Sequence, residues 1–345
     1  MDARVVTFGE IMLRLSPPGR QRFPQAKSFE AVYGGGEANV AAGLAALGLR
    51  PEFVTRLPEN DLGAACLQYL AQHGVDTRHV LRGGERLGIY FLEQGAAVRG
   101  SQVIYDRVGS SFATLKPSML DWPAILEGVS WFHWTGITPA VSEAAASACL
   151  DGIRAARQLG LTVSCDLNFR AKLWKWGREA GEVMPGLVEG CDLAVANEED
   201  TEKVFGIRAE GADVRRGRVE AEKYRPVCEQ LAVRFPRLAT VAITLRGSLS
   251  ASHNTWGAVL WQKGRFFTSP TYDLEDIVDR VGAGDSFSAG LIYGMLRFPT
   301  DPQHVLDFAV AASALKHSIF GDFNLARVGE VEALLGGNAS GRVER

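Results

Sequence analysis

The chain has 345 residues, of which 46% are hydrophobic and 22% charged, so it can bury a large core as one domain, with or without a small appendage. A formal net charge of -3 provides no broad basic field, which argues against nucleic acid or an anionic membrane as a partner and favours a small ligand. Five widely spaced cysteines without a CxxC pair argue against a disulfide framework and a zinc site, and no apolar run reaches the roughly 18 residues of a membrane span. We therefore expect a cytoplasmic protein with reduced, mostly buried thiols.

Strand-like and helical patterns alternate along most of the chain. Short buried strands are expected at residues 5–9, 51–55, 130–135, 161–166, 193–196 and 240–245. Helices are expected between them at residues 34–47, 61–73, 142–159, 199–204 and 222–235. This alternation predicts an α/β fold in which helices cover both faces of a mostly parallel sheet and ligands collect at the carboxyl ends of its strands.

Two stretches interrupt the alternation, at about residues 13–33 and 88–107. The first carries three prolines and no helical pattern, and the second holds two alternating runs joined through glycines. We expect antiparallel strands outside the main sheet, which form either a small lid over a ligand or an edge hairpin without a role. The arginine-bearing stretch 206–222 is expected to be an exposed insertion.

The last third of the chain is expected to hold a hairpin at 256–267 and three helices at 286–296, 302–317 and 328–335. We therefore expect one domain over residues 1–335, with both lid segments inserted into it. Residues 336–345 are expected to form a flexible tail.

The most informative segment is the small-residue turn before the helix at 286–296. Gly282, Ala283 and Gly284 leave the backbone N–H groups open to an anion, and the start of a helix adds to the attraction. Asp285 follows as a candidate proton acceptor. A carboxylate repels bound phosphate, but its presence makes sense if it deprotonates a hydroxyl that attacks a phosphoryl group. The alternative is an ordinary turn in which Asp285 caps the helix.

A second glycine-rich turn, Gly34, Gly35 and Gly36, leads into an alanine-rich helix. It matches neither a Walker loop nor GxGxxG. Its backbone could hold a polyhydroxylated ligand, and Asn39 offers a donor and an acceptor one helical turn later. Packing or capping is the alternative for this segment.

These two segments together resemble the two signatures of the ribokinase, or PfkB, family of carbohydrate kinases. They match the patterns Gly-Gly-Gly-x-x-Asn-x-Ala and Asp-x-x-Gly-Ala-Gly-Asp-x-Phe, in the family's order and with lid strands between them. The resemblance runs from residue 5 to about residue 335 and implies a ribokinase-like α/β fold with a small β-lid. It also implies that Asp285 is the catalytic base, that residues 282–284 form the anion hole and that residues 34–36 hold the sugar.

Arg107 in the expected lid and Arg170 just after a strand favour an acid sugar, because forked guanidinium donors match a carboxylate. Within the family, the chain is similar to the 2-keto-3-deoxygluconate kinases. That similarity implies that the substrate is bound by Gly34, Tyr90, Tyr105, Arg107, Arg170 and Asp322. Surface ion pairs are the alternative for the arginines, half-buried lid contacts for the tyrosines, and nucleotide phosphates for Arg170.

The resemblance also implies a nucleotide site and metal sites. ATP is expected to contact Asn168, Arg170, Asn197, Thr244, Arg246, Gly247 and the turn at 282–284, with Ala309 beside the adenine. The stretch 243–247 is expected to end a strand in a small turn. Asp200 is expected to order water around Mg²⁺, and Asp279 to lie near a monovalent cation such as K⁺. Close helix packing is the alternative for Ala309.

The expected reaction is transfer of the γ-phosphoryl group of ATP to O6 of 2-keto-3-deoxygluconate. A kinase for fructose or ribose and a non-catalytic sugar- or nucleotide-binding regulator are the alternatives. A nicotinamide dehydrogenase lacks support, since no glycine fingerprint follows the first strand. Apolar residues on the lid strands, such as Phe91 and Ile104, favour a homo-oligomer that pairs lid to lid, although they could equally cover the sugar.

Overall fold

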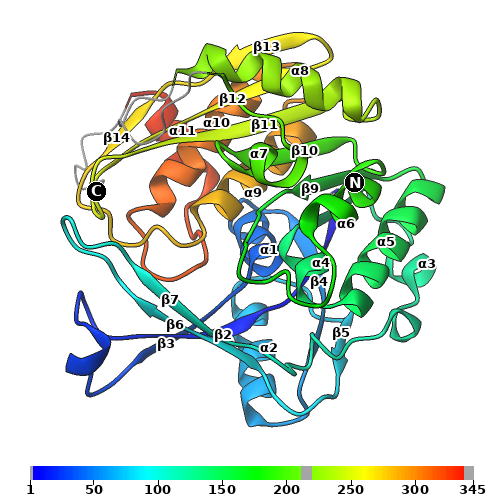
Figure 1. The fold of residues 1–345 in the computed structure, drawn as a ribbon, viewed down its shortest axis with the longest axis vertical. Coiled ribbons are helices and arrows are strands. Elements are labelled where there is room, and N and C mark those ends of the chain that lie inside the picture. The colour runs from blue at the N-terminus through cyan, green and yellow to red at the C-terminus, as the bar shows by residue number, and fades with distance from the viewer. Residues whose placement is uncertain (1–2, 211–219, 338–345) are drawn as a thin grey trace.

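The computed structural model describes residues 3–210 and 220–337. The chain forms two sheets (Figure 1). The strands of the larger sheet are β1 (Arg4–Phe8), β4 (Arg50–Leu57), β5 (Val80–Arg82), β8 (Trp131–Thr135), β9 (Thr162–Asp166), β10 (Leu193–Asn197), β11 (Thr240–Ser248), β12 (Asn254–Gln262), β13 (Arg265–Thr268) and β14 (Tyr272–Leu274). Their order is β13-β12-β11-β10-β9-β8-β1-β4-β5, and β14 also pairs with β12.

The central part of the large sheet is parallel, as the alternation predicts. Every pair from β5 to β11 runs parallel, whereas β12 to β14 are antiparallel additions at one end. Helices cover the sheet because its central strands are apolar on both faces. The helices are α1 (Gly36–Ala46), α2 (Asp61–Gln72), α3 (Trp122–Ile125), α4 (Ile137–Val141), α5 (Glu143–Gln158), α6 (Ala180–Val188), α7 (Asp200–Phe205), α8 (Arg225–Arg234), α9 (Ala283–Arg297), α10 (Pro302–Lys316) and α11 (Val328–Leu335).

Two apolar clusters lie on the two faces of this sheet. One joins strand residues such as Val163 and Ile243 to α3, α5, α6 and α8. The other joins Val5 and Leu260 to α1, α9, α10 and α11. The expected α/β class, with helices on both faces, is confirmed.

A separate four-stranded sheet lies apart from the large one (Figure 1). Its strands are β2 (Met12–Ser16), β3 (Glu30–Gly34), β6 (Gly88–Glu93) and β7 (Gln102–Asp106), in the order β3-β2-β6-β7. The two interrupting stretches therefore form one small sheet, as expected. One expectation was wrong in detail, because β2 and β6 pair in parallel rather than antiparallel.

The ends of several elements differ from the expectation. β11 continues through Gly247, which pairs with Thr255, so the turn expected at 243–247 is not formed there. The helix α9 begins at Ala283, ahead of the expected residue 286. The helix α6 was missed, because Gly181, Pro185 and Gly186 give its sequence the composition of a loop.

All five cysteines are free and buried, as expected. Within residues 3–210 and 220–337, none of the helices has both the length and the apolar character that crossing a membrane requires. The expected tail lies mostly outside the described residues, as does most of the expected insertion at 206–222.

Candidate functional site

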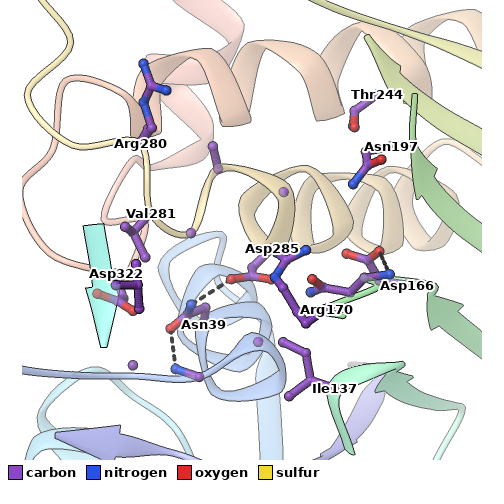
Figure 2. A pocket seen from close by; sticks show the side chains of 18 of the residues that line it. Asn39, Ile137, Asp166, Arg170, Asn197, Thr244, Arg280, Val281, Asp285 and Asp322 are labelled. Carbon is purple, nitrogen blue, oxygen red and sulfur yellow. Dashed lines mark hydrogen bonds between the residues drawn. The ribbon is translucent and has the colours of Figure 1, made fainter. Parts of the chain in front are cut away.

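A cavity of about 410 Å³ lies between the small sheet and the carboxyl ends of β9, β10 and β11. The small sheet contributes Tyr90 and Tyr105, and the large sheet contributes Asp166 and Asn197. The two glycine-rich turns, residues 34–36 and 282–284, also line the cavity. Figure 2 shows that Asn39, Asp285, Arg170 and Asp166, which come from separate segments, lie near one another.

The turn before α9 has the form that an anion site needs. Gly282 precedes the helix with a φ of 82°, and a Cβ there would lie 2.0 Å from the main-chain oxygen of Asp322. Only glycine fits both conditions. The first N–H groups of a helix have no acceptor within the helix, and residues 282–284 line the cavity, although the N–H of Ala283 also lies 3.4 Å from the main-chain oxygen of Arg280.

Asp285 lies in the first turn of α9 and does not cap it. Its carboxylate instead accepts a hydrogen bond of 2.6 Å from Nδ2 of Asn39. The Asn39 Oδ1 in turn accepts from the N–H of Gly35 at 3.1 Å (Figure 2). The two glycine-rich turns are thus joined through one amide side chain, and the capping alternative for Asp285 does not hold.

Burial makes Asp285 a stronger base than an exposed aspartate. Removal from water raises the pKa of its carboxyl to about 6, while the Asn39 hydrogen bond and the charge of Arg170 act in the opposite direction. Such a carboxylate is mostly ionised at neutral pH and can still accept a proton.

Tyr90 and Asp322 line the cavity as expected, but their polar groups already bind each other. The Tyr90 hydroxyl donates to Asp322, whose other oxygen accepts from Arg14 at 2.9 Å. Arg14 also contacts Asp279 at 2.7 Å and has no exposed side-chain surface. Gly34 is required here, because a Cβ would fall 1.9 Å from an Asp322 oxygen.

Arg107 and Arg170, the two arginines expected to hold a carboxylate, line the same cavity. Arg107 is largely buried, is paired with Glu10 and lies over the Tyr105 ring. Its Nε and Nη1 atoms are buried, and no described residue accepts a hydrogen bond from them. Arg170 is exposed, donates to the main-chain oxygen of Phe169 and lies beside Asp285 and Asp166 (Figure 2).

The residues expected at the nucleotide fall into two groups. Asn168, Asn197, Thr244 and Arg246 line the cavity. Gly247 lies within a strand ladder, away from the cavity lining. Ala309 is also absent from that lining: it is fully buried in α10 and its Cα would lie 2.9 Å from a Cβ added at Gly290 of α9. The structure therefore supports the packing alternative for Ala309.

An oxygen-rich corner of the cavity fits a hydrated Mg²⁺. Asp166 and Asp200 are buried there, and the pKa of Asp166 is raised well above its usual value by burial and by the charges of Asp200 and Asp285. The Oδ1 atom of Asn168 is buried and has no partner among the described residues. A divalent cation would relieve the repulsion among the carboxylates, and Mg²⁺ prefers oxygen ligands.

Asp200 itself is engaged by the backbone. Its carboxylate accepts from the N–H groups of Asn197 and Phe169, and the Asn197 side chain accepts from the N–H groups at the start of α7. A carboxylate held in this way is suited to binding the water ligands of an ion rather than to coordinating the ion directly.

Comparison with known proteins identifies the family. A family model described as pfkB family carbohydrate kinase matches residues 2–322. The chain belongs to this family.

Individual relatives indicate which kinds of kinase within the family this chain resembles. A solved structure from Thermotoga maritima named 2-dehydro-3-deoxygluconokinase is 48% identical, with a TM-score of 0.92 over 97% of this chain and 100% of that one. A 2-dehydro-3-deoxygalactonokinase of Haloferax volcanii is 32% identical over 341 residues, which is 99% of both chains. A 2-dehydro-3-deoxygluconokinase of Thermoproteus tenax is 31% identical over 324 residues, covering 92% of this chain and 89% of its own. The protein is thus a phosphotransferase that acts on an alcohol group.

Sequence reasoning missed several residues of this carbohydrate kinase that lie in or under the cavity. Asp166 ends a strand at the expected edge of the sheet, and that position could have marked it. Arg280 lies within the second signature and also lines the cavity. Arg14 stands between leucines in a strand, where nothing in the local sequence distinguishes it from a surface residue. Lys316 ends α10, whose Ala-rich pattern indicates only packing.

Proposed function

We propose that the protein transfers the γ-phosphoryl group of ATP to the 6-hydroxyl of 2-keto-3-deoxygluconate. The observation that carries this proposal is the buried Asp285 carboxylate beside the N–H groups at the start of α9, with two arginines in the same cavity. The names of the relatives from Thermotoga and Thermoproteus agree with this substrate.

In the proposed reaction, Asp285 accepts the proton of the sugar hydroxyl. The hydroxyl oxygen forms a bond to the γ-phosphorus while the bond from that phosphorus to the bridging oxygen of ADP breaks. The N–H groups of residues 282–284 stabilise charge on the transferred group, and Asn39 holds Asp285 in place. When bound, Mg²⁺ would neutralise phosphate charge beside Asp166 and Asp200.

The buried donors of Arg107 support an acid sugar. Arg107 lines the cavity, and two of its nitrogens are buried without an acceptor among the described residues, which is costly unless a bound ligand and a small shift of the side chain supply one. A carboxylate matches that need, and Arg170 offers a second guanidinium in the cavity lining. Tyr105, Tyr90 and Gly34 would then border the sugar chain.

A substrate panel tests the proposal. ADP release should be measured with 2-keto-3-deoxygluconate, its galacto epimer, gluconate, fructose and ribose. We expect the highest kcat/KM for the two keto acids, and the ratio between them assigns the epimer, a choice on which the relatives' names differ. Preference for fructose or ribose would identify a neutral-sugar kinase, and the absence of turnover with every sugar would favour a non-catalytic regulator.

Arginine variants provide the matched test. R107M and R170M should each lose activity toward keto acids by about tenfold or more, with much smaller losses for any weak neutral substrate. R86M is the control, because Arg86 forms an exposed pair with Asp106 away from the cavity lining. Equal losses for acid and neutral sugars would contradict recognition of a carboxylate by these residues.

A further inference from the structure

Lys316 is a fully buried lysine beneath the anion-binding turn. It is the last residue of α10 and has no exposed surface. Its Nζ donates to the main-chain oxygen of Ile319 at 2.9 Å and lies 3.5 Å from that of Asp279. The ammonium group thus stands between the segment that follows α10 and the residue that begins the turn.

The turn and the segment after α10 are held together by several other bonds. The main-chain oxygen of His317 accepts from the N–H groups of Val278 and Asp279. The N–H of Gly321 donates to the Asp279 carboxylate at 3.2 Å. The carbonyl oxygens around Nζ are therefore fixed in place by the backbone on both sides.

Charges around Lys316 come from four groups on neighbouring elements. Burial lowers the pKa of the Lys316 ammonium group and Arg14 acts in the same direction, whereas the carboxylates of Asp279, Asp322 and Asp285 favour its charged form. With three buried carboxylates and two buried cations, the net charge of this region is small. Without the ammonium group, carbonyl oxygens and a negative excess would remain, which is the environment that binds a small monovalent cation.

We propose that the Lys316 ammonium group is a built-in cation that positions the anion-binding turn, in place of a monovalent metal ion near Asp279. Lys316 is a positioning residue, since it acts through the backbone of Asp279 and not on the substrate. The inference rests on the proposed kinase function, and it replaces the K⁺ expected near Asp279 from the sequence.

The wild-type enzyme provides the first test and needs no substitution. Turnover should be measured at equal ionic strength with K⁺, Na⁺ or tetramethylammonium as the sole monovalent cation. We expect kcat to differ by less than about twofold among the three salts. Activation by K⁺ of about fivefold or more over tetramethylammonium would overturn the proposal.

Substitution of Lys316 gives the second test. K316M keeps the bulk of the side chain without its charge and should lower kcat by about tenfold or more, whereas K116M, at an exposed lysine, should not. K316A opens space beside the same oxygens, so KCl or ammonium chloride should restore part of its activity and tetramethylammonium chloride should not. Full activity in K316M, or a loss in K316A that no cation restores, would contradict a built-in cation.

Melting temperatures do not depend on catalysis and therefore test this inference separately from the proposed function. The melting temperature of K316A should rise with KCl but not with tetramethylammonium chloride at the same ionic strength, and that of the wild type should respond equally to both salts. An identical response of the two proteins would overturn the inference even in an active kinase. Conversely, failure to phosphorylate any sugar would end the proposed function while this cation-specific stabilisation could still be seen.

Discussion

Asp285 is buried, and its proposed task as the general base requires a charged carboxylate. Its pKa of about 6 means that the carboxyl is protonated below that pH and ionised above it. The D285N variant cannot accept the proton, so we expect kcat to fall by about 10³-fold. ADP release measured with saturating keto acid checks this expectation.

The same burial predicts that D285N is the more stable protein. A carboxyl whose pKa is raised on folding contributes stability at low pH and loses it as the pH rises from 3.8 to about 6. Above pH 6 the charged carboxylate costs up to about 3 kcal/mol, which the substitution removes. Thermal melts at pH 8 should therefore show a higher melting temperature for D285N, and near-normal turnover in that folded variant would exclude Asp285 as the base.

We expect Asn39 to influence the pH at which the proposed base becomes active. In the wild type, kcat/KM should rise with pH through about 6 and then level off. The Asn39 hydrogen bond favours the charged carboxylate, so N39A should move this rise to higher pH and lower the plateau. N60A removes an amide that caps α2 and serves as the control, since it should reduce stability without moving the pH profile.

At the scale of elements, the close contact of α9 and α10 depends on glycine. A Cβ at Gly290 would lie 2.9 Å from the Cα of Ala309, which is backbone and cannot rotate away. G290A should therefore lower the free energy of unfolding by about 1–3 kcal/mol. G186A is the matched control in α6, where an added Cβ meets nothing within 4 Å, and should be neutral or stabilising. Equal stability of the two variants in urea titrations would contradict this role of Gly290.

Elements whose apolar residues follow the spacing of a strand or of a helix could be predicted from the sequence, whereas elements without such a spacing could not. The buried parallel strands and the helices α2 and α5 have apolar residues at strand or helix spacing. The end of β11 could not be placed, because Gly247 reads locally as a turn while the ladder with β12 carries it onward. The role of Ala309 was open for a similar reason, since an alanine in a helix packs against a neighbouring helix or a ligand equally well.

At the scale of the whole molecule, Arg14 links the small sheet to the main body. It projects from β2 and binds Asp279 and Asp322, which precede α9 and follow α10. R14M leaves two buried carboxylates without their cation and should cost about 3–5 kcal/mol of stability. R86M removes a half-exposed pair and should cost less than about 1 kcal/mol. Chemical denaturation of both variants measures the difference, and a small loss for R14M would show that other contacts hold the sheet.

The two signatures located the cavity from sequence, but not the contacts inside it. Arg14 and Asp322 are 308 positions apart, and no local pattern in either segment indicates that they meet. The same holds for the hydrogen bond from Tyr90 to Asp322, which no local pattern indicates. A sequence motif indicates the local backbone conformation at a site. The pairing of buried charges depends instead on which distant segments pack together in the folded protein.

The hydrogen bond between Asn39 and Asp285 joins positions 246 residues apart. A chain still being synthesised therefore lacks Asp285, the proposed base, until α9 has emerged and docked. Two separately produced fragments, one ending before α9 and one beginning with it, should each be inert and should regain turnover only on association. Phosphorylation of sugar would then serve as a direct signal that the chain has completed its fold.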